Sequence, residues 1–153
     1  MERALYELNR FDSDVTATYF EPQLVAAGAE PVGAWLSMLY YDKAMFIIQG
    51  GDWTNIGDQL DAGVLQATSN AGAGSKAVAG KTITTYTSTA TNENNIWYIH
   101  VDVSELDVDG GYAYIQLYVT VSANDSVYLA AICEREHRVF EPVPVTNVTE
   151  IVN

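Results

Sequence analysis

The chain has 153 residues, of which 48% are hydrophobic and 18% are charged, so it is apolar enough to fold as one domain and not a wholly disordered chain. Twenty acidic residues against seven basic ones give a formal net charge of −13, which argues against nucleic acid and anionic membranes as partners. The longest uninterrupted apolar stretch, residues 44–48, is far shorter than the roughly 20 residues of a membrane-spanning helix, and we expect no secretory signal at the N-terminus.

The first half of the chain predicts weak and irregular elements. Residues 1–34 contain Pro22 and Pro31 and no regular apolar period, so we expect an extended arm. Strands are predicted at 35–41 and 44–49, joined through residues 41–43, and the run 45–48 is apolar enough to be buried on both faces. Weaker strands follow at 63–68 and 82–87. Residues 69–81, rich in Ala and Gly, predict a long flexible loop, and residues 87–95 predict a polar loop.

The second half contains the clearest strands. Apolar and polar residues alternate over 96–103, with Trp97, Ile99, Val101 and Val103 on one side, and again over 112–122. A period of two is typical of a strand with one buried face. The residues between these two strands end in Asp109-Gly110-Gly111, which predicts a hairpin or a sharp corner. A further strand is expected at 127–133, and Pro142 and Pro144 make the last residues unsuitable for a helix or a central strand.

Short strands at regular spacing without intervening helices predict an all-β fold, an antiparallel β-sandwich of jelly-roll type. We expect three regions: an N-terminal arm at residues 1–34, the sandwich at 35–139 and a C-terminal arm at 140–153.

Two motifs have the beginnings of a ligand site. Residues 74–82 end in Gly80-Lys81-Thr82, as a phosphate-binding loop does, but five residues instead of four separate the glycines, and the β-branched residues that follow do not favour the required helix. Residues 105–110 place acidic side chains as a calcium loop does, yet the twelfth position is Gln116 within a predicted strand. We therefore expect no nucleotide site at residues 74–82. We interpret residues 105–110 as an acidic turn, with a weak calcium site as the alternative.

No catalytic, metal or cofactor site is predicted. His100 and His137 are the only histidines, and His100 beside Asp102 is interpreted as a surface pair on one strand face. Cys133 is the only cysteine, which excludes an internal disulfide and is in keeping with assembly in a reducing cytoplasm; we expect it in the core.

Tyrosines give the one positive signal of a binding surface. Tyrosine is enriched where protein surfaces meet, and five of them fall on the polar faces of strands that we expect to be neighbours: Tyr98, Tyr112, Tyr114, Tyr118 and Tyr128. The alternative is that the protein's own arm or a loop covers this face. The C-terminal arm is a second candidate interface, because its apolar residues are spaced along an extended segment that we expect to lie across a neighbouring subunit: Val143, Val145, Val148 and Ile151.

Several segments together resemble small structural proteins of tailed bacteriophages, in which a "ydkatF" strand, an "eqAtda" strand, a "seLDv..gf.yv" corner and an "rY.P"-like element recur. The corresponding segments here are residues 31–38, 41–48, 65–68, 101–112 and 138–142. The resemblance implies a β-sandwich present in many copies in the virion and supplies no functional residues.

We therefore expect a capsid decoration protein, assembled in the host cytoplasm, that binds the major capsid protein on the outer capsid surface and forms a homo-oligomer, a dimer or trimer. One alternative is a neck or tail component of the same particle. Another, from a different class, is a carbohydrate-binding module in which Trp53 and Trp97 stack on sugar rings.

Overall fold

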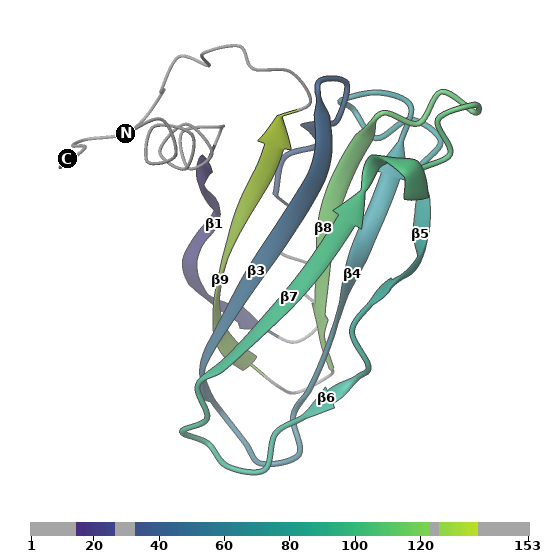
Figure 1. The fold of residues 1–153 in the computed structure, drawn as a ribbon. Helices are drawn as coiled ribbons and strands as arrows, with labels where there is room; N and C mark the ends of the chain where they lie inside the picture. The colour runs from purple at the N-terminus through teal and green to yellow at the C-terminus, as the bar shows by residue number, and fades with distance from the viewer. Residues whose placement is uncertain (1–14, 27–32, 123–125, 138–153) are drawn as a thin grey trace, which may run out of the picture.

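The computed structural model describes residues 15–26, 33–122 and 126–137 (Figure 1). Their regular structure consists of strands and one short 3-10 helix: β1 (Val15–Ala26), β2 (Leu36–Ser37), β3 (Tyr41–Trp53), β4 (Gln59–Ala67), β5 (Lys76–Thr82), β6 (Tyr86–Thr87), β7 (Asn95–Asp102), η1 (Val103–Glu105), β8 (Tyr114–Val121) and β9 (Ser126–His137). Within these ranges, no helix is long and apolar enough to cross a membrane.

The strands form two antiparallel sheets that pack against each other (Figure 1). One has the order β1-β9-β3-β7, and the other has the order β2-β8-β4-β5, with β6 also pairing with β4. The hydrogen-bonded pairs are nested along the chain, since β1 pairs with β9, β2 with β8, β3 with β7, and β4 with β5 and β6. Such nesting, split alternately between two sheets, is the arrangement of a jelly roll. The predicted all-β sandwich is confirmed.

Alternating side chains from both sheets fill the core. In β8 the inward row Ile115, Leu117, Val119 and Val121 is completely or almost completely buried, as the period of two predicted. In β3 the inward residues Phe46 and Ile48 are fully buried, whereas Met45 and Ile47 face outward and are only partly buried. The expectation that residues 45–48 are buried on both faces is therefore wrong, because no other described layer covers the outer face of this sheet.

The structure also corrects the expected N-terminal arm over residues 15–26, which form the edge strand β1. Phe20 and Val25 of this strand belong to the core. Its pairing with β9 shifts register on both sides of Phe20, and each shift interrupts the period of two. This interruption explains why the segment looks irregular in sequence, and an edge position explains why Pro22 is tolerated.

Three further differences concern the middle of the chain. Residues 76–81, expected in a flexible loop, form most of β5, which ends at Thr82 and whose only fully buried side chain is Val78. The predicted strand 35–41 is reduced to Leu36–Ser37, and it lies in a different sheet from β3. The chain turns at residues 38–41, where the amide of Tyr41 donates to the carbonyl of Met38 over 3.2 Å, so residues 41–43 are the beginning of β3 and not a turn.

The connection from β7 to β8 is a corner between the two sheets, which confirms one of the two predicted alternatives and excludes the hairpin. Asp102 begins η1 with a capping box: its carboxylate accepts from the amide of Ser104 over 2.9 Å, and the Glu105 carboxylate accepts from the amide of Asp102 over 2.8 Å. The corner is thus fixed by its own side chains.

Candidate functional site

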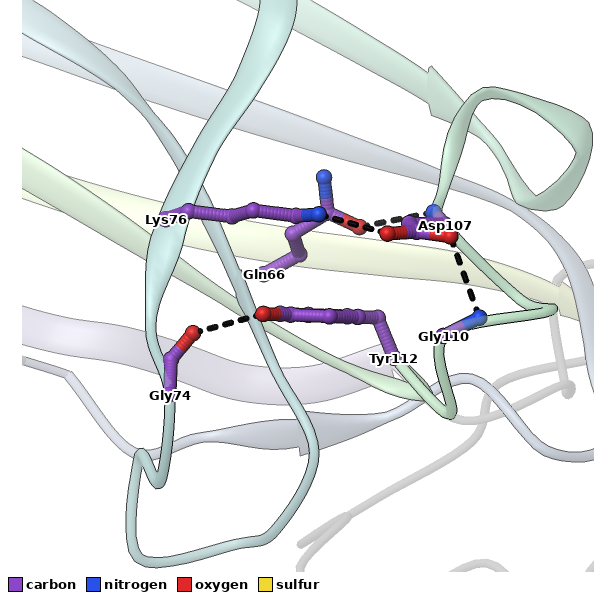
Figure 2. Close-up of polar contacts among 6 residues, drawn as sticks. All are labelled: Gln66, Gly74, Lys76, Asp107, Gly110 and Tyr112. Carbon is purple, nitrogen blue, oxygen red and sulfur yellow. Dashed lines mark hydrogen bonds and ion pairs between the residues drawn. The ribbon is translucent and has the colours of Figure 1, made fainter.

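The acidic corner after β7 is bound to β5 by side chains (Figure 2). The Asp107 carboxylate accepts from Lys76 Nζ over 2.5 Å and from the amide of Gly110 over 3.0 Å, while its own amide donates to Gln66 Oε1 over 2.8 Å. The Tyr112 hydroxyl donates to the carbonyl of Gly74 over 2.9 Å, so the loop before β5 is held as well. These contacts connect the corner to β4 and β5.

A lysine therefore occupies the place at Asp107 that a cation would take in a calcium loop. The hydrogen bond from Lys76 is the main cause that lowers the pKa of Asp107, and the same bond raises the pKa of Lys76. The carboxylate of Glu105, the first residue of the motif, accepts from Lys81 Nζ over 2.6 Å. In the ranges that the structure covers, no three His, Cys, Asp or Glu side chains come together as a metal site. The geometry favours an acidic turn stabilised by two ion pairs.

The phosphate-loop candidate has a different structure from the one its chemistry requires. Lys81 and Thr82 lie at the end of β5, and residues 83–85, which are neither strand nor helix, lead to β6. A phosphate loop needs the amides of a following helix N-terminus, and none follows here. The Lys81 ammonium, which would contact a phosphate in such a loop, instead forms an ion pair with Glu105.

The tyrosines predicted to form one row are divided between the two sheets. Tyr114 and Tyr118 lie on the outer face of the β2-β8-β4-β5 sheet, and Tyr112 lies just before β8. Tyr98 and Tyr128 lie on the outer face of the other sheet. The predicted single surface is therefore wrong, because β7 and β8 are joined by a corner and are not neighbours in one sheet.

Tyr112, Tyr114 and Tyr118 each contact other residues of the chain. Tyr112 donates to Gly74, and its ring lies 4.1 Å from Lys76 Nζ, a cation–π distance. The ring of Tyr118 covers Gly63, its partner across β8 and β4. Tyr114 is half-buried opposite Ala67. The other predicted interface residues, Val143, Val145, Val148 and Ile151, lie outside the described residues.

The structure also places Asp102, His100 and Cys133, the other residues that the sequence analysis considered for catalysis or metal binding. Asp102 directs its carboxylate to Ser104 in the capping box, and hydrogen bonds from the Ser104 side chain and amide are the main causes that lower its pKa. His100 is exposed on the outer face of β7. Cys133 is completely buried, as expected.

The two tryptophans proposed as sugar platforms belong to the interior. Trp53 is buried, and Trp97 packs partly buried against the core. The ring of Tyr86 lies between them, with centroid distances of 5.6 Å to Trp53 and 5.3 Å to Trp97. This aromatic cluster corrects the role assigned to both tryptophans.

A different surface, which the sequence did not reveal, lies on the outer face of the β1-β9-β3-β7 sheet. The register places Ile132, Ile47 and Tyr98 in one row across β9, β3 and β7. Ile96 lies in the next row of the same face, opposite Gln49, and Tyr128 and Leu24 lie opposite each other farther along it. Large apolar side chains therefore come from all four strands. The exposed fractions are 37% for Ile132, 61% for Tyr98, 52% for Ile96, 56% for Tyr128 and 49% for Leu24. We call these six residues the outer sheet face.

A groove with a volume of about 360 Å³ opens at one end of the outer sheet face. It lies where β3 and β7 meet and where β9 begins. Among its lining residues are Gln49, Gly51, Asn94, Ile96 and Tyr128. The groove therefore combines amide side chains with apolar walls.

No protein-family model matches the chain, and no curated protein matches its sequence. The functional argument consequently rests on the fold and on the geometry of these surfaces.

Proposed function

We propose that the chain is a capsid decoration protein of a tailed bacteriophage, a non-catalytic structural protein that binds the major capsid protein from outside. The observation that supports this proposal is the outer sheet face, in which five of the six large apolar side chains are each between 37% and 61% exposed. Monomeric proteins seldom leave this many large apolar side chains bare on one sheet face, and interfaces are enriched in tyrosine.

The electrostatics favour an external position. The chain carries a net charge of −13, which repels packaged DNA and is better placed on the solvent side of a shell. Lys76 and Lys81 are engaged in ion pairs with the corner, which reduces the positive charge available for phosphate. The jelly-roll arrangement of strands is also common in viral capsid proteins, although the fold alone does not define a function.

The mechanism is burial of the outer sheet face against the shell. A stable interface covers roughly 1,600 Å² in total, which exceeds what six side chains supply, so polar residues around them must contribute. Oligomerisation into a dimer or trimer increases the residence time of each copy through avidity. Many weakly bound copies then strengthen the shell against internal pressure.

The experiment compares two substitutions of exposed apolar residues. Ile132→Asp places a charge within the outer sheet face, and Val108→Asp places one on the corner, where Val108 is 57% exposed. Purified virions carrying each variant are analysed by quantitative gel staining. We expect Ile132→Asp to lose particle attachment and Val108→Asp to retain it. Normal attachment of Ile132→Asp would overturn the assignment of this face.

Copy number separates the proposal from its closest alternative, a neck or tail component. A shell protein should be present in hundreds of copies per virion, and a ring-shaped connector in on the order of ten. A low count with attachment still sensitive to Ile132→Asp would place the same interface in the neck or tail. Absence of the protein from purified virions would overturn both assignments.

A further inference from the structure

We infer that the groove at the end of the outer sheet face binds a neutral glycan. Because Ile96 and Tyr128 belong to both surfaces, the glycan binds only to copies whose outer sheet face is not buried on a shell. The groove's volume of about 360 Å³ lies within the range of roughly 300–1,000 Å³ that is typical of small-molecule sites. It is a depression on rigid strands, because Gln49 and Ile96 are direct partners in the β3–β7 ladder and Ala130 lies opposite Gln49 in β9. A site on paired strands holds its contacting groups in fixed positions.

The lining is electrically neutral in a strongly acidic protein. None of the described residues that line the groove is charged, although the chain has twenty carboxylate residues. A charged ligand would find no counter-charge there, and a phosphorylated or sulfated ligand would be repelled by the net charge. The chemistry of the lining thus selects an uncharged ligand.

The polar groups fit hydroxyl-rich ligands. Gln49 and Asn94 are exposed, and each carries one amide oxygen that accepts and one amide nitrogen that donates. Adjacent sugar hydroxyls also donate and accept, so one amide can satisfy two of them. Aliphatic ligands would leave both amides without partners, which costs binding free energy.

Tyr128 supplies the apolar platform that a sugar ring requires. Its side chain is 56% exposed, and an aromatic ring with a polar tip suits a ligand with one C–H face and a hydroxyl rim. Gly51 lies beside it without a side chain; a Cβ there would stand 3.4 Å from Tyr128 Cβ. The glycine therefore leaves open the space next to the tyrosine.

The test uses the isolated full-length protein on an array of neutral and acidic oligosaccharides, followed by titration calorimetry with the neutral probes maltohexaose, cellohexaose and a galactan oligosaccharide. We expect binding to at least one neutral probe and not to acidic ones. Tyr128→Ala and Gln49→Ala should each weaken it by about tenfold, as expected for loss of one stacking or bidentate contact.

Tyr98→Ala is the matched control, because Tyr98 is a similarly exposed tyrosine on the same sheet that does not line the groove. Circular dichroism checks that each variant is folded, and Gly51→Val, which fills the space instead of removing a contact, should abolish binding independently. Absence of binding to every neutral probe, binding to acidic glycans alone, or equal loss in Tyr98→Ala and Tyr128→Ala would overturn the inference.

The two proposals can fail separately. Ile132 lies outside the groove, so Ile132→Asp should retain saccharide binding even where particle attachment is lost. Gln49→Ala should lose saccharide binding and retain particle attachment. Loss of both functions in both variants would mean that the groove and the outer sheet face are one interface and would overturn the glycan site.

Discussion

Because Tyr118 packs on Gly63, the effect of Gly63→Ala on the free energy of unfolding should depend on whether the tyrosine ring is present. The two residues are direct partners across β8 and β4. A Cβ at Gly63 would lie 2.6 Å from Tyr118 Oη, 2.7 Å from Tyr118 Cε1 and 2.8 Å from Thr82 Cγ2. Favourable contacts between nonbonded carbons are about 3.5–4.0 Å, so Gly63→Ala must displace the tyrosine ring.

The magnitude follows from two opposing terms. Overpacking of this kind costs about 1–3 kcal/mol, whereas replacing a strand glycine with alanine otherwise stabilises by roughly 0.5–1 kcal/mol. We therefore expect Gly63→Ala to lower the free energy of unfolding by about 1–2 kcal/mol. In a Tyr118→Ala background the ring is absent but the close approach to Thr82 Cγ2 remains, so the same substitution should cost less stability than it does beside the ring.

Urea unfolding of the four proteins in this double-mutant cycle measures the coupling, with tryptophan fluorescence as the signal because Trp53 is buried in the native state. A coupling energy of about 0.5–2 kcal/mol is expected. If Gly63→Ala has the same effect in both backgrounds, the ring does not rest on Gly63, and Tyr118 would again be available for an interface as the sequence suggested.

Three other predictions test the core, the corner and the thiol. Phe46 is completely buried, so Phe46→Ala should lower the free energy of unfolding by about 3–5 kcal/mol in urea titrations; a loss below about 1 kcal/mol would contradict the packing. Asp107 has a pKa below its ordinary value of 3.8 because Lys76 donates to it, so its contribution to stability is present above pH 3.8 and is lost as the pH falls through the lower folded value. Asp107→Asn should therefore reduce the acid-induced decrease of the urea midpoint, and an unchanged pH profile would exclude the ion pair. Cys133 is buried, so its thiol should react with an aromatic disulfide reagent only as fast as the protein unfolds; rapid reaction in native buffer would refute its core position.

Local sequence was sufficient for strands whose pairing is regular. β7 and β8 alternate without interruption, and burial of one strand face then requires apolar residues at every second position. The corner between them was also predictable, because Gly111 adopts a φ of 80° that glycine tolerates easily. The sandwich class followed from these elements and from the absence of helical periodicity.

Register shifts obscured the strands that were missed. β1 loses its period of two at the shifts around Phe20, and β5 pairs with β4 through a shift between Gly63 and Leu65. In such strands, which side chains point into the core depends on where the register shifts, and the strand's own sequence does not indicate that position.

Only the tertiary structure decided which residues share a surface. Ile47, Tyr98 and Ile132 form one row because three strands far apart in the chain align in a particular register. The sequence by itself determined that β7 and β8 each have a polar face, but it could not determine that these faces belong to different sheets. The physical reason is that the side-chain period is a local property of each strand, whereas strand order is decided by which apolar faces bury each other across the whole molecule.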